Sequence, residues 1–142
     1  MPPYPYVPGR NARHEEAVFA AFHDSVREGM DARELSATLA WRAGWQFVRA
    51  GYFWEAHEVL EPVWMALPPN SAERRFVQGV IQAANAALKL EMGRPRAALR
   101  LCGIADDWLA ETGGAERIMG LAVSDVRKAL TEVRMGVGSD SQ

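Results

Sequence analysis

Three kinds of feature are scarce in this chain of 142 residues, and each scarcity excludes a class of protein. No apolar run approaches the roughly 20 residues that a helix needs to cross a bilayer. The single cysteine, Cys102, has no partner for an internal disulfide. The 16 lysine and arginine residues are outnumbered by 18 aspartate and glutamate residues, so the basic surplus of proteins that bind nucleic acid is missing. We therefore expect neither a membrane span nor a nucleic-acid partner.

The amino terminus also lacks the charged and apolar regions of a secretory signal peptide. With a lone cysteine as well, the simplest interpretation is a cytoplasmic protein. The length suits one domain with one core, over residues 1–142. A composition of 49% hydrophobic and 24% charged residues is typical of globular proteins. We expect no cofactor.

Strand-like alternation of apolar and polar residues is absent, so the chain is predicted to be all-α, a compact bundle of five or six helices. Four prolines within residues 2–9 favour an extended N-terminal arm, residues 1–12, packed on the helical body at 13–135. Residues 136–142 are expected to form a flexible tail. Helices are expected over residues 13–28, 32–50, 52–67, 72–92, 95–111 and 115–135, the last interrupted near Gly120.

A weak internal repeat accompanies these helices. Gly51 and Gly93 each stand between two predicted helices, and an alanine, Ala56 or Ala98, follows each by five residues. Small residues at this spacing allow close pairing of helices, as in helix-turn-helix units of the tetratricopeptide kind. Two such units are too few for a solenoid, so a bundle with tetratricopeptide-like pairing is predicted.

The most unusual stretch, residues 51–64, reads GYFWEAHEVLEPVW. It sets three glutamates and one histidine among large apolar residues: Glu55, His57, Glu58 and Glu61. On a helix, His57, Glu61 and Trp64 share one face. A helix this apolar is expected to be packed on several sides, and a carboxylate buried there needs a donor, a cation or water. Pro62 predicts a kink or an early end.

A polar line follows on the next predicted helix, where Gln78, Gln82 and Asn85 are spaced four and three residues apart. Buried amides need hydrogen-bond partners, and the preceding helix offers acids and an imidazole at similar spacing. Because a short turn joins the two helices, antiparallel contact is expected. We predict that the face with His57 and Glu61 meets the face with Gln78 and Gln82.

These two segments, YFWEAHEVLE with Trp64 and then FVQGVIQ, resemble the family known as domain of unknown function 309. The motifs span roughly residues 41–104, and Tyr6-Val7-Pro8-Gly9 is similar to the leader of some members. Pro62 departs from the family pattern, which puts the straightness of its helix in doubt. The resemblance implies a small all-helical domain and no assigned reaction. It also implies a set of signature residues: Glu55, His57, Glu58, Glu61, Trp64, Gln78 and Gln82.

A metal site receives little support from these residues. His57 and Glu61 can face one ion, in a pattern that resembles the HExxH motif of zinc hydrolases with glutamate in place of the second histidine. Two ligands do not make a tight site, and the sequence does not place a third, such as His14, His23 or Glu91. We therefore predict no metal, with this pair as the weak candidate.

Two functions remain open at this stage. The first is a structural or interaction protein whose Glu/His/Gln cluster binds a small ligand or a protein partner, with homodimer formation left open. In that interpretation the polar residues also form a hydrogen-bonded network that locks two helices together. The alternative is a hydrolase-type enzyme that uses Glu58 or Glu61 as general base, with His57 holding a metal. A solvent-connected pocket at Glu58, His57 and Gln82 would favour binding or chemistry.

Overall fold

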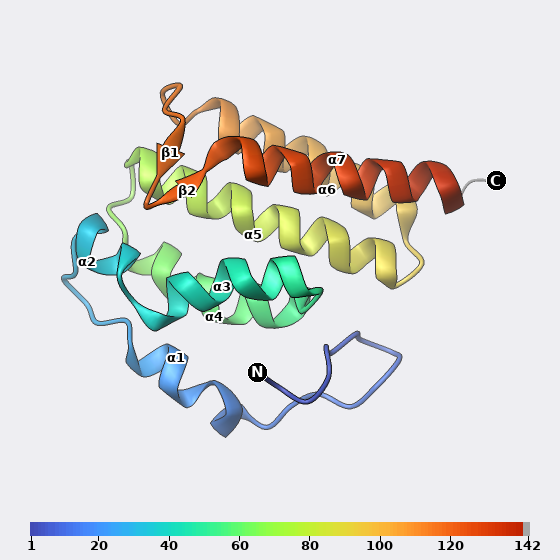
Figure 1. Cartoon of the computed structure of the whole chain (residues 1–142), viewed down its shortest axis with the longest axis horizontal. Helices are drawn as coiled ribbons and strands as arrows, with labels where there is room; N and C mark the ends of the chain where they lie inside the picture. Colours follow the sequence, from blue (N-terminus) through green and yellow to red (C-terminus); the bar gives the residue numbers. More distant parts are fainter. Residues whose placement is uncertain (141–142) are drawn as a thin grey trace.

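A computed structural model describes residues 1–140 and shows a helical bundle with one short hairpin (Figure 1). The predicted all-α class is confirmed. The elements in chain order are a 3₁₀ turn η1 (Glu16–Phe19), α1 (Ala20–Asp24), α2 (Ala32–Ser36), α3 (Leu39–Ala50), α4 (Phe53–Ala66), α5 (Ala72–Glu91), α6 (Pro95–Ala110), β1 (Arg117–Ile118), β2 (Leu121–Ala122) and α7 (Val123–Asp140). No helix within residues 1–140 has the length and apolar character needed to span a bilayer.

Helix α5 occupies the centre of the bundle, between the α3–α4 pair and the α6–α7 pair (Figure 1). Its buried side chains, among them Phe76, Val80 and Ala84, belong to the single hydrophobic core. The N-terminal arm and α1 lie on the far side of α3 and α4 (Figure 1). As a result, α4 is covered on one side by α5 and on another by the start of the chain.

Two glycine turns produce the predicted helix-turn-helix pairs. Gly51 ends α3 with φ of 86°, and the Tyr52 N–H donates to the Phe47 carbonyl at 2.8 Å. Gly93 has φ of 74°, and the Arg94 N–H donates to the Lys89 carbonyl at 2.9 Å. A left-handed residue at this position satisfies the last carbonyls of a helix and reverses the chain with little strain. Both turns therefore let the following helix pack back on the preceding one.

The predicted first helix, 13–28, is wrong at both ends. Glu15 is extended, and only residues 16–24 are helical. At the other end, the Ser25 hydroxyl donates to the Phe22 carbonyl at 2.6 Å and accepts from the Ala40 N–H at 3.1 Å. A serine side chain that bonds the backbone competes with helix continuation.

The predicted helix 32–50 is divided in two by Thr38. Its hydroxyl donates to the Leu35 carbonyl at 2.7 Å and accepts from the Trp41 N–H at 3.2 Å. A threonine in an extended conformation is a favourable N-cap, so it begins a new helix instead of extending the old one. Pro62, by contrast, does not stop α4, which continues to Ala66.

The C-terminal region also differs from its prediction. Residues 117–122 form a hairpin whose turn, Met119 and Gly120, has positive φ at both positions. Such a turn suits the twist of two adjacent strands. The Trp41 indole N–H donates to the Met119 carbonyl at 2.8 Å, which ties the hairpin to α3. Helix α7 reaches Asp140, beyond the expected end at 135, because Val137 is still buried. Of the predicted tail, residues 141–142 lie outside the described residues.

Close helix approach at Gly44 generates a first prediction. A Cβ at Gly44 would overlap the side chain of Leu60, which is fully buried on α4. We expect Gly44→Ala to lower the free energy of unfolding by about 1–3 kcal/mol, because a packed core cannot absorb the added methyl group. Urea denaturation measures the change.

Gly103 on α6 is the matched control, because nothing lies within 4 Å of a Cβ built there. Gly103→Ala should stabilise the protein by about 0.5–1 kcal/mol through the lower entropy of the unfolded chain. Equal effects of the two substitutions would contradict close packing of α3 on α4.

Candidate functional site

The site is built around Glu55, a fully buried carboxylate in the first turn of α4. Its Oε2 atom accepts a hydrogen bond from the Tyr6 N–H at 2.7 Å and lies 2.8 Å from Nε2 of His14. The His14 side chain is itself almost fully buried. The N-terminal turn of a helix favours negative charge, which further stabilises a carboxylate at this position. One side chain of α4 therefore holds two points of the N-terminal segment.

The arm is ordered by its own side chains as well. Asn11 accepts from the Val7 N–H at 3.0 Å and donates to the Pro5 carbonyl at 2.8 Å. Val7 is buried, and the Tyr6 ring meets Trp54 edge-on with a centroid distance of 5.0 Å. The predicted packing of the proline-rich arm on the body is confirmed.

The second oxygen of Glu55, Oε1, is buried and has no hydrogen-bond partner, the one such side-chain atom among residues 1–140. The charge of Glu55 also acts on Glu91, at the end of α5. Burial raises the pKa of the Glu91 carboxyl, Arg10 opposes the rise, and the Glu55 carboxylate adds to it. The Arg10 guanidinium also donates to the Glu91 carbonyl oxygen. Two acids and one arginine thus share this end of the bundle.

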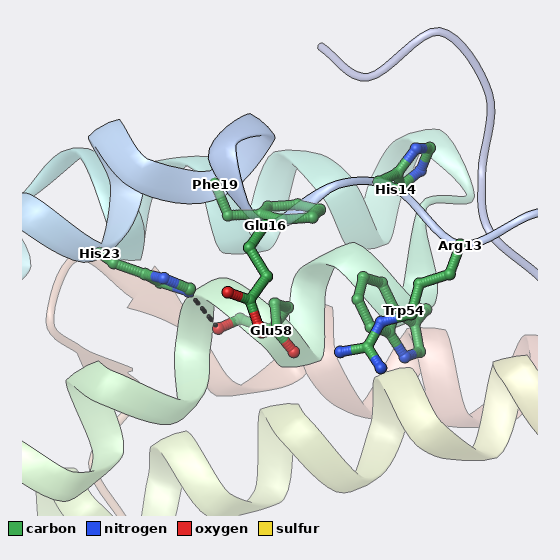
Figure 2. Close-up of a pocket in the computed structure, with 7 residues that line it drawn as sticks. All are labelled: Arg13, His14, Glu16, Phe19, His23, Trp54 and Glu58. Atoms are coloured by element: carbon green, nitrogen blue, oxygen red, sulfur yellow. Dashed lines mark hydrogen bonds between the residues drawn. The ribbon is translucent and has the colours of Figure 1, made fainter.

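A cavity of about 200 Å³, which we call the arm pocket, lies between the first half of α4 and the segment that Glu55 anchors (Figure 2). Helix α4 contributes Trp54 and Glu58. The remaining lining residues precede or belong to η1 and α1: Arg13, His14, Glu16, Phe19 and His23. The two faces of the pocket are therefore separated by more than 30 residues of sequence but held together by the buried carboxylate.

Charged groups of both signs face this pocket. Figure 2 shows the carboxylates of Glu16 and Glu58 pointing into the same space, with the Arg13 side chain beside Trp54. The Arg13 guanidinium carbon lies 5.2 Å from the Trp54 ring centroid. The ion pairs found within residues 1–140 involve none of Arg13, Glu16 and Glu58. His23 uses Nε2 to contact the Glu58 carbonyl at 3.4 Å.

The predicted site residues divide into separate places. Glu55 and Glu58 face the arm, whereas His57 and Glu61 form a 3.1 Å pair on the outer side of α4, with side chains 32% and 49% exposed. Trp64 lies under Arg74, whose guanidinium carbon is 4.3 Å from the ring centroid. No group of three potential ligands suited to a metal occurs in the described part of the chain.

The predicted network between α4 and α5 is not formed. Gln78 and Gln82 are partly exposed, and no hydrogen bond within residues 1–140 joins them to His57 or Glu61. Helix α5 buries its apolar residues and turns its polar line, which includes Asn85, toward the surface side. Whether His57, Glu61, Trp64, Gln78 and Gln82 bind a ligand stays a prediction.

The partners of Glu55 are the residues that the sequence interpretation missed. In the sequence, His14 and His23 could be named as possible ligands, but their positions in the fold could not be inferred. Arg13 and Glu16, which line the same pocket, belong to no recognisable motif. The one clue was the requirement that a buried carboxylate find a donor.

Removal of Glu55 should destabilise the protein strongly. Glu55→Ala leaves the Tyr6 N–H and His14 without their acceptor, so we expect a loss of about 3 kcal/mol or more in urea denaturation. The arm should also become sensitive to limited proteolysis. Glu61→Ala, on the same helix, is the control and should cost no more than about 0.5 kcal/mol. A small effect of Glu55→Ala would show that the arm is held by other contacts.

Glu91 should give a stability change that depends on pH. Because the folded pKa lies above the usual 4.5, the charged form lowers the free energy of unfolding at neutral pH, and this penalty disappears as pH falls below 4.5. Glu91→Gln should therefore raise the melting temperature at pH 7, by an amount that shrinks on acidification. Thermal melts across this range, with the exposed Glu132→Gln as control, measure the trend. A difference independent of pH would contradict it.

The comparison with known proteins covers the centre of the chain. Residues 41–101 match the model of a family described as a domain of unknown function, DUF309. The match includes the helices that carry Glu55 and Glu58 and leaves out the arm with His14. No curated protein and no solved structure matches the chain. The match confirms the resemblance of the two motifs, and residues 41–101 are similar to the DUF309 family.

Proposed function

We propose that this protein is a binding module that takes a small polar ligand in the arm pocket. The observation that carries the proposal is a cavity lined by Arg13, Glu16 and Glu58, which have no ion-pair partner within residues 1–140. Side chains of both charges that converge on a concave site without pairing are typical of groups that orient a ligand.

The shape of the site supports a small molecule. At about 200 Å³ the arm pocket is smaller than the roughly 300–1,000 Å³ of sites that enclose drug-sized ligands. Phe19 and Trp54 supply apolar walls, so a ligand can bury carbon atoms while its polar groups meet the charged side chains. Glu55 holds the N-terminal wall of the pocket in place through Tyr6 and His14, which reduces the ordering cost of binding.

The hydrolase alternative has less support. Glu61 lies outside the arm pocket and is paired with His57, so only Glu58 is placed to act on a bound molecule. No serine or cysteine lines the pocket. Cys102 is buried in the core, where burial raises the pKa of its thiol, and the reactive thiolate is therefore disfavoured. The arm pocket is a small cavity, and its lining residues give no specific support for a protein partner.

Ligand binding can be tested by a fragment screen on ¹⁵N-labelled protein. We expect a subset of polar fragments to shift the Trp54 indole signal and the amide signals of residues 13–23, because these line or flank the arm pocket. The Trp54 signal is identified by its loss in Trp54→Phe.

Two neighbouring glutamates provide matched controls. Glu16→Trp places a large side chain at the pocket and should abolish the shifts, whereas Glu15→Trp, at an exposed residue that does not line the pocket, should preserve them. Absence of any fragment with this pattern of shifts would contradict the proposed function.

A further inference from the structure

We infer that the ligand of the arm pocket is a small zwitterion, a molecule with an ammonium group at one end and a carboxylate at the other. The inference rests on the proposed function and adds the chemical class of the ligand. It comes from the arrangement of charge around the cavity, in which two carboxylates share one region and a guanidinium occupies another (Figure 2).

The carboxylates of Glu16 and Glu58 select a cation. They come from different elements, η1 and α4, and both point into the pocket (Figure 2). Like charges in one site repel, and a cation between them converts that repulsion into two favourable contacts. An ammonium group offers three N–H donors for these oxygens, and the ring of Phe19 beside them favours positive charge.

A metal ion fits this site less well than an organic cation. Within residues 1–140, no three histidine, cysteine, aspartate or glutamate side chains are grouped to hold one. Aromatic walls favour an ammonium group that carries carbon atoms, because the apolar part of the ligand is buried against them.

Arg13 adds the second half of the specificity. Its guanidinium is positioned against the face of Trp54 at 5.2 Å and forms no ion pair with Glu16 or Glu58. A planar guanidinium with free N–H groups matches a carboxylate in a two-point contact. A ligand with a single positive charge would be repelled by Arg13, whereas a zwitterion satisfies the arginine and the glutamates together.

The histidines leave this charge pattern in place. His14 is committed through Nε2 to Glu55, and His23 contacts the Glu58 carbonyl oxygen through Nε2. Among the other charged side chains, Arg13 gives the pocket one positive group, and Glu16 and Glu58 give it two negative groups. The ammonium end is therefore the stronger determinant.

The test uses three matched sets of probes: ω-amino acids from 3-aminopropanoate to 6-aminohexanoate, and the alkylamine and the alkanoate of each length. Binding is followed by NMR at the Trp54 indole signal. For at least one length we expect the zwitterion to bind about five- to tenfold more tightly than the amine and more tightly still than the acid. This comparison needs only the unmodified protein.

Conservative variants then assign the two ends. Glu16→Gln and Glu58→Gln should each weaken the zwitterion and the amine several-fold and leave the weak binding of the acid unchanged or improved. Arg13→Gln should weaken the zwitterion and remove its advantage over the amine. Asp24→Asn and Arg27→Gln, exposed residues outside the pocket, should change none of these affinities.

The outcomes separate the two proposals. The zwitterion proposal would be overturned if amines or acids bound as tightly as the zwitterion at every length, or if Glu58→Gln left the affinities unchanged. The proposed binding function would survive either result. Failure of all probes and of the fragment screen to shift signals at the arm pocket would overturn both.

Discussion

The interaction on which the rest of the site depends is the hydrogen bonding of a buried carboxylate to the start of the chain. Glu55 lies fully inside the protein, and its Oε2 atom is shared by the Tyr6 N–H and His14. A charge in such a place is tolerated only when donors surround it, and here the donors come from a segment with little secondary structure. The arm therefore supplies the hydrogen bonds that the body needs, and the carboxylate gives the arm a fixed position.

This mutual dependence also explains why the pocket exists where it does. A proline-rich segment has few backbone donors to offer a neighbour, so it cannot pack as a strand or helix. It is held on the body instead at discrete points, by Glu55 and by the hydrogen bond from Arg10 to the Glu91 carbonyl oxygen. The chain between those points and α1 passes over α4 without filling the space beneath it. The charged residues of that passage, Arg13 and Glu16, then face Glu58 across the cavity.

The helices were predictable from sequence where local signals decide them. Apolar periodicity and the glycines at 51 and 93 were enough for α4 to α6 and for the end of α3, because a left-handed turn is a local property of glycine. The end of α1 at Ser25 was not predicted, because the Ser25 hydroxyl is held by the distant Ala40 N–H. The break at Thr38 rests on local bonds to Leu35 and Trp41, and the apolar pattern that continues through it conceals this N-cap. The hairpin at 117–122 was not predicted, because it is fixed in part by a hydrogen bond from the distant Trp41.

Only part of the site could be predicted from the sequence. The need of a buried glutamate for a donor follows from the sequence, but the donor follows from the fold, and His14 is 41 residues away from Glu55. Gln78 and Gln82 are predicted to meet the face with His57 and Glu61, because a short turn joins the two helices. Proximity of α4 and α5 was correct, yet the apolar residues of α5 fill that contact and leave the amides partly exposed.

The spacing of the three glutamates on α4 explains how one motif serves three environments. Successive residues on a helix are rotated by about 100°, so a step of three falls about 60° short of a full turn. Glu55 is buried against the N-terminal arm, Glu58 lines the arm pocket, and Glu61 points toward solvent, where His57 pairs with it. The rotation that hides the first carboxylate therefore presents the second to the arm pocket. The two acids are therefore coupled, because the segment that Glu55 anchors forms the opposite wall of the pocket that Glu58 lines.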